Sequence, residues 1–223
     1  MKAGKAAGPS GLVVDIISAA GKAGMEGLLK ICQKFWISGE MPYDWLTSIT
    51  VPLYKGKGDA LNCASYRGIR LLEHSLKIVE RIVFNRLLEN IKIDAYQYGF
   101  QGGKSTIDAI FIIRQLQERY CAKSKKLYHI FVDLEKAFDR VPRKAIQWCL
   151  RRQLVPERLV QLVMATYHNP KTAICTPYGN TDEFEINVGV HQGSILSPLL
   201  FITIMEEITK LIRSNEYWEE ELA

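Results

Sequence analysis

Residues 128–142 have the sequence "YHIFVDLEKAFDRVP". An apolar run ends there on Asp133, and an aromatic residue, Phe138, follows five positions later. The run predicts a buried strand over residues 127–133. A carboxylate at the end of a buried strand is costly unless it is paired or binds a metal ion. Asp133 is therefore either a metal ligand or a cap for the turn at residues 134–138.

Helical patterns lie on both sides of this strand. Leu76, Val79, Ile82, Val83 and Leu87 share one face of a helix and are expected to be buried. Apolar spacing and prolines predict helices over residues 27–38, 74–91, 105–120, 142–154, 156–167 and 197–213. Gly39 and Pro42 end the first of these helices, and Ser105 with Asp108 makes a capping pair at the start of the third. Strands are expected over residues 48–54 and 65–72, and in a pair joined at residues 178–180. This order predicts a mixed α+β fold.

Bulk composition restricts the class of protein. A hydrophobic content of 48% with 24% charged residues is typical of a globular chain, and no apolar run is long enough to span a bilayer. Asp15 interrupts the N-terminal apolar stretch, so we expect no signal peptide and no membrane partner. The five cysteines form no C-x-x-C pair, which favours reduced thiols in an intracellular protein.

Charge is unevenly distributed along the chain. Residues 1–126 carry 19 Lys and Arg against 11 Asp and Glu, whereas residues 127–223 carry 10 against 13. A basic first part beside an acidic second part suggests a polyanionic partner held near carboxylates, with ordinary surface scatter as the alternative.

Three further stretches could contact phosphates or bases. They are "PLYKGKGD…SYRGIRLL" over residues 52–72, "QYGFQGGKSTIDAI" over 97–110 and "GVHQGSILSPLLF" over 189–201. Lysines at a hairpin tip can grip a triphosphate, and a glycine lets the backbone approach a ligand closely. The "GGKST" sequence lacks the first glycine of a nucleotide-hydrolase phosphate loop, because Tyr98 takes its place.

The order of "GPSG", "KGKGD…YRGIRLL", "YGFQGGKSTIDAI", "FVDLEKAFDRVP" and "GVHQGSILSPLLF" strongly resembles the reverse transcriptase domain of non-LTR (LINE-type) retrotransposons. The resemblance implies an RNA-directed DNA polymerase of the right-hand type. Its parts would be an N-terminal extension with fingers over residues 1–126 and a partial palm over 127–223. It also implies an RNA template, a DNA primer, dNTP substrates, magnesium (manganese being the alternative ion), and a place in the nucleus and cytoplasm.

The resemblance also implies roles for individual residues. Asp133 would be catalytic and would bind metal together with the carbonyl of Leu134. Phe138 would exclude a ribose 2′-OH, with core packing as the alternative. The nucleotide would be held by Lys55, Arg67, Leu134, Phe138, Gln192 and Gly193, with Lys57 and Arg70 as alternative cations. The template would lie near Gly99, Phe100 and Ser105.

The sequence departs from the family after the helix at residues 197–213. The aromatic-Ala-Asp-Asp hairpin and the thumb are absent, and we interpret the acidic run at 219–221 as solvated. Asp139 is expected to point away from the metal site, with a salt bridge as one possible contact. We therefore expect this chain alone not to extend primers. The alternatives are a non-catalytic nucleic-acid-binding remnant and a polymerase of the group II intron or retron type.

Overall fold

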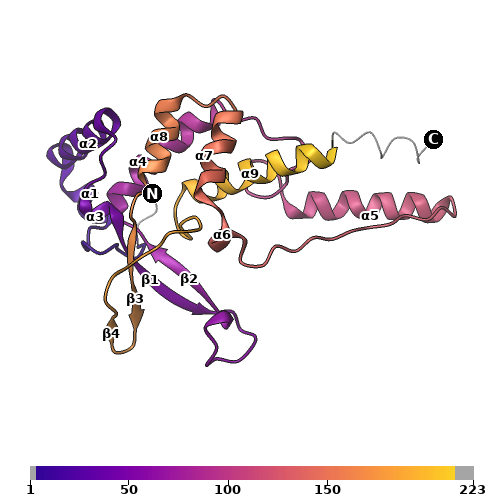
Figure 1. Ribbon diagram of the computed structural model, residues 1–223, viewed down its shortest axis with the longest axis horizontal. Coiled ribbons are helices and arrows are strands. Elements are labelled where there is room, and N and C mark those ends of the chain that lie inside the picture. Colours follow the sequence, from indigo (N-terminus) through magenta and orange to yellow (C-terminus); the bar gives the residue numbers. More distant parts are fainter. Residues whose placement is uncertain (1–3, 214–223) are drawn as a thin grey trace.

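The computed structural model describes residues 4–213, in which helices surround one end of a small mixed sheet (Figure 1). The helices are α1 (Val14–Ala19), α2 (Gly21–Ser38), α3 (Tyr43–Leu46), α4 (His74–Leu88), α5 (Thr106–Ala122), α6 (Ala137–Arg140), α7 (Arg143–Arg152), α8 (Glu157–Ala165) and α9 (Leu196–Arg213), with a 3₁₀ turn, η1 (Cys63–Ser65). The strands are β1 (Thr47–Tyr54), β2 (Tyr66–Leu71), β3 (Lys171–Thr176), β4 (Gly179–Asn180) and β5 (Phe184–Glu185). The predicted α+β class is confirmed. None of these helices is both long and apolar enough to cross a membrane. The acidic run at 219–221 lies outside the described residues.

Strand β1 is the centre of the sheet. It pairs with β2 in an antiparallel register that places Ile49 opposite Leu71, and with β3 in parallel. The strand order is β2-β1-β3-β4, and β5 also pairs with β3. The predicted strands on both sides of the Gly/Lys loop are thus confirmed, and β1 and β2 form a long hairpin with residues 55–65 at its tip.

In the core, both α4 and α7 pack against α8 and α9. Leu76, Val79, Val83 and Leu87 of α4 are buried, as the helical spacing predicts. Ile82 was also expected inside but is 43% exposed, because it lies one position round the helix from Val83. The other helices contribute Ile146 and Leu150 from α7, Leu159, Val160, Leu162 and Val163 from α8, and Leu196, Leu199 and Leu200 from α9.

Prolines place the starts of α7 and α8. Pro142 and Pro156 occupy the N-cap positions, and the helices begin at the next residues. Helix α9 begins one residue before the predicted Ser197-Pro198. All three predicted helices are therefore confirmed.

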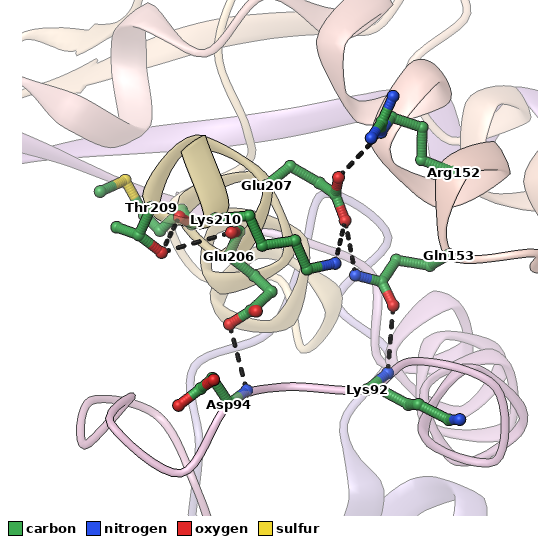
Figure 2. Close-up of polar contacts among 9 residues, drawn as sticks. Lys92, Asp94, Arg152, Gln153, Glu206, Glu207, Thr209 and Lys210 are labelled. Carbon is green, nitrogen blue, oxygen red and sulfur yellow. Dashed lines mark hydrogen bonds and ion pairs between the residues drawn. The ribbon is translucent and has the colours of Figure 1, made fainter. Parts of the chain in front are cut away.

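A buried carboxylate joins α9 to the end of α7 (Figure 2). Glu207 accepts hydrogen bonds from Arg152 at 2.9 Å, from Gln153 at 2.7 Å and from Lys210 at 2.7 Å. Burial alone would raise the pKa of this carboxyl, but the bonds from Lys210 and Arg152 outweigh it and lower the pKa. Glu207 thus remains ionised and holds the two helices together.

The predicted buried strand at residues 127–133 is wrong. This segment has no regular structure, and Tyr128, Ile130, Phe131 and Val132 are all about 80% exposed. A strand exists only beside a partner that satisfies its backbone groups. Among the described residues no strand pairs with this segment: β2 pairs with β1, and β3 pairs with β1, β4 and β5.

Helix α5 and the segment that follows it project together from the helical body (Figure 1). The predicted capping box is confirmed: Ser105 accepts a hydrogen bond from the Ile107 amide at 2.9 Å, and its own amide donates to Asp108 at 2.7 Å. No residue of α5 is buried, however. Local signals thus define this helix, but its apolar side chains are uncovered.

Helix α2 is likewise defined by local signals, and most of its apolar side chains are not buried. It ends at Gly39 in the left-handed conformation, with φ +77°, as predicted. Of its apolar face only Phe35 is buried, in edge-to-face contact with Trp45 at 5.9 Å between ring centroids. The apolar face of α2 therefore covers little of the core.

Candidate functional site

The β1–β2 hairpin tip, residues 133–139 and residues 191–198 enclose a cavity of about 830 Å³. These three segments come from distant parts of the chain. All the residues predicted to contact the nucleotide line this cavity: Lys55, Arg67, Leu134, Phe138, Gln192 and Gly193. The predicted catalytic residue, Asp133, also lines it. The fold therefore places the candidate site residues around one space, although it does not test their roles.

One wall of the cavity is cationic. The Lys55 ammonium donates to the Ala64 carbonyl at 2.8 Å, and Lys57 and Arg67 are exposed beside it. Arg70 does not line the cavity. Its burial, followed by the nearby Arg143, lowers the pKa of its guanidinium to about 10. Of the two alternative cations, Lys57 thus faces the cavity and Arg70 does not.

The opposite wall carries carboxylates. Asp133, Glu135 and Asp139 all line the cavity, and Asp133 is exposed. Asp133 does not cap the next helix, because α6 begins after Lys136 and has no side-chain cap. Asp139 accepts a hydrogen bond from the side-chain Nε2 of Gln192 at 2.6 Å, in place of the salt bridge that the sequence suggested.

A magnesium site needs several oxygen ligands. Nowhere in the described part of the chain do three His, Cys, Asp or Glu side chains group closely enough to hold a metal ion. Asp133 alone is not a metal site. The described residues thus provide no complete group of side-chain ligands for magnesium.

Phe138 lies between the cavity and the core. Its ring stacks on Phe201 with centroids 4.9 Å apart, and Phe100 meets it edge-on at 5.9 Å. It is half-buried. Both interpretations of Phe138 therefore agree with the geometry, since one face of the ring packs on α9 while the residue still borders the cavity.

Gly193 forms a tight turn against β2. Its φ is +122°, and a Cβ there would stand 2.4 Å from the Arg70 carbonyl oxygen. The Arg70 amide donates to the Gln192 carbonyl at 2.7 Å. Only glycine fits this approach, because any side chain would displace the turn from the strand.

Of the three residues predicted to lie near the template, one lines the cavity and two do not. Phe100 lines the cavity and is 62% exposed. Gly99 and Ser105 do not line it, and Ser105 caps α5. The Lys104 ammonium between these residues and α5 donates to the Ala95 and Gln97 carbonyls.

Comparison with known proteins identifies the family. A family profile described as reverse transcriptase (RNA-dependent DNA polymerase) matches residues 55–220. The chain belongs to the reverse transcriptase family. Its relatives are of the non-LTR kind, as the motif order predicts. They include the Pol polyprotein of type-1 retrotransposable element R2 from Nasonia vitripennis, 28% identical over 94% of this chain and 20% of that protein. The RNA-directed DNA polymerase from mobile element jockey of Drosophila melanogaster is 25% identical over 82% of this chain and 20% of that protein. This reverse transcriptase domain spans about a fifth of the length of these relatives.

Sequence reasoning missed two residues that hold the site of this reverse transcriptase domain from behind. Arg143 donates to the carbonyls of Tyr167 at 2.9 Å and Ile186 at 2.5 Å, and so fixes the segment that leads to the Gln-Gly turn. Glu80 bonds to the other end of that turn. No local signal marks Arg143. Glu80 could have been noticed, because a carboxylate stands on the apolar face of α4 between Val79 and Val83.

Proposed function

We propose that this domain is the fingers and part of the palm of an RNA-directed DNA polymerase, and that the cavity receives a deoxynucleoside triphosphate. The observation that carries the proposal is the pairing of a cationic wall, made by Lys55, Lys57 and Arg67, with Asp133 across one cavity. Residues 1–126 would be the extension and fingers and 127–223 part of the palm, joined in one sheet by β1 and β3.

The cationic wall suits the triphosphate. Arg67 can offer a planar fork of donors, and Lys55 keeps two donors after its bond to Ala64. In polymerisation a primer 3′-OH attacks the α-phosphate and pyrophosphate leaves. Holding the triphosphate still and neutralising its charge supply most of the rate.

Asp133 and the carbonyl of Leu134 would be the part of a magnesium site that this chain contributes. Bound magnesium would neutralise charge that develops on the phosphoryl oxygens. Because residues 4–213 contain no complete ligand group, we expect this part of the chain to bind nucleotide without extending a primer.

The same proposal gives the domain an RNA template and a DNA primer as partners, with a place in the nucleus and cytoplasm. Contacts to phosphates and to the shape of the hybrid would dominate its binding. Phe100 at the rim of the cavity is the residue best placed to touch the template base. A non-catalytic, nucleic-acid-binding role is the outcome that would remain if nucleotide binding failed.

Calorimetric titration with Mg²⁺ and dATP tests the site. Arg67→Ala should weaken dATP binding by about tenfold to a hundredfold, because it removes a charge-assisted contact of about 1.5–3 kcal/mol. Arg86→Ala is the matched control, since Arg86 is an exposed cation on α4 that pairs with Glu89 and does not line the cavity. Equal effects of the two changes would contradict the assignment.

Sugar selection tests Phe138. The unmodified chain should bind dATP more tightly than ATP, and Phe138→Val should bring the two affinities together because the smaller side chain leaves room for the 2′-OH. An unchanged dATP preference in Phe138→Val would leave Phe138 as a packing residue. In a primer-extension assay, activity of residues 1–223 that Asp133→Ala abolishes would show that the chain holds a complete metal site after all.

A further inference from the structure

Glu80 is a buried carboxylate with an unusual set of partners. It belongs to α4, its side chain is 1% exposed, and it faces the segment that follows Gly193. Its two oxygens accept hydrogen bonds from the Ser194 hydroxyl at 2.6 Å and from the Ile195 amide at 2.9 Å. Both donors come within two residues of the turn that closes the cavity.

The turn is thereby held from two sides. On the cavity side, Asp139 accepts a hydrogen bond from the side-chain Nε2 of Gln192, and the backbone amide of Arg70 donates to the Gln192 backbone carbonyl. On the core side, Glu80 holds Ser194, whose hydroxyl also accepts from the Leu196 amide at the start of α9. Gly193 lies between these anchors with no freedom to shift toward β2, since the Arg70 carbonyl is already in contact.

The charges around Glu80 do not form an ion pair with it. Lys77, one turn earlier on α4, attracts it only weakly, and Tyr167 faces it from the end of α8. Burial outweighs the bonds from Ser194 and Ile195 and raises the pKa of Glu80 to about 7. A carboxylate accepts both bonds at once, whereas a carboxylic acid has fewer free lone pairs for them.

We infer that Glu80 is a positioning residue: its two hydrogen bonds set the place of the Gln192–Gly193 turn at the wall of the cavity, and with it the fit of the nucleotide. The positional part stands on the contacts of Glu80 alone. The consequence for nucleotide binding rests on the proposed function.

Hydrogen exchange of the intact chain tests the positional part. In Glu80→Ala the amides of residues 192–196 should exchange at least tenfold faster relative to those of α8. Glu207→Ala is the matched control, because Glu207 is an equally buried carboxylate that joins α9 to α7 away from the turn (Figure 2). It should lower overall stability without a selective effect on residues 192–196. Selective acceleration confirms the inference, and equal acceleration in both variants overturns it.

Ser194→Ala provides a second route if Glu80→Ala does not fold. It removes one of the two bonds and leaves the Ile195 amide bound to Glu80, so the exchange at 192–196 should rise less than in Glu80→Ala but still selectively. No change in that segment would overturn the inference.

The affinity for Mg²⁺-dATP between pH 6 and pH 8.5 tests the consequence for binding. Glu80→Gln keeps the shape of the side chain but does not titrate. The ratio of the dissociation constants of the unmodified chain and Glu80→Gln should therefore change severalfold through about pH 7. Taking the ratio cancels the titration of the triphosphate, because it affects both chains equally. A constant ratio refutes the link to binding. If the unmodified chain does not bind dATP at any pH, the proposed function fails, while the exchange experiment still decides the role of Glu80.

Discussion

Replacing Gly193 with alanine should be among the most damaging single changes that remove no side chain. The new Cβ would lie 2.4 Å from the Arg70 carbonyl oxygen, closer than such atoms approach without a shift of the backbone. A φ of +122° costs a residue with a side chain roughly 1–3 kcal/mol. Moving the turn would also break the 2.7 Å bond between the Arg70 amide and the Gln192 carbonyl, which contributes about 1 kcal/mol. We therefore expect Gly193→Ala to lower the free energy of unfolding by about 3 kcal/mol.

Two other glycines separate these contributions. Gly179 has φ +118° but nothing within 4 Å of its Cβ position, so Gly179→Ala reports the backbone conformation alone. Gly102 is open and does not have a positive φ, and Gly102→Ala should be neutral or slightly stabilising because alanine restricts the unfolded chain. Urea denaturation followed by tryptophan fluorescence measures all three, since Trp45 is buried beside Phe35. A difference of less than about 0.5 kcal/mol between Gly193→Ala and Gly179→Ala would refute the close contact with Arg70.

Further predictions concern the core and the segment behind the turn. The pKa of Glu80 is about 7 in the folded chain and 4.5 in its ordinary state, so its ionisation destabilises the fold increasingly as pH rises from 4.5 to 7. Glu80→Gln should therefore raise the free energy of unfolding at pH 8 by up to about 3 kcal/mol. Urea titrations at several pH values should show this gain vanish below pH 4.5. Leu162→Ala should cost about 3 kcal/mol because Leu162 is fully buried, whereas Leu88→Ala, at a half-exposed position, should cost less than 1 kcal/mol in the same assay. Arg143→Lys should cost about 2 kcal/mol and speed hydrogen exchange at residues 186–190, because an ammonium cannot reproduce the fork that binds two carbonyls; unchanged exchange there would contradict this role.

Elements with local signals could be predicted from the amino-acid sequence. The prolines before α7 and α8, the Ser105–Asp108 box of α5 and the glycine that ends α2 each act on the backbone within a turn of their own position. Spacing on α4 identified most of its buried face for the same reason, since four of five predicted residues are inside. The ordered motifs also pointed to the family, and the family profile matches them.

Which of these apolar faces are covered depends on contacts between segments that are distant in sequence. The apolar run before Asp133 predicts a strand, yet it is exposed because a strand also needs a neighbour with which to pair. The apolar side chains of α5 are likewise uncovered. Arg67 and Arg70 point to opposite faces of one strand by alternation, but the fold decided that the cavity lies on the Arg67 side. The partners of Glu80 lie 114 and 115 residues away in sequence, a distance over which periodicity carries no information. The hydrophobic pattern shows which face of a segment could be buried. Whether that face is buried depends on whether another segment packs against it in the folded chain.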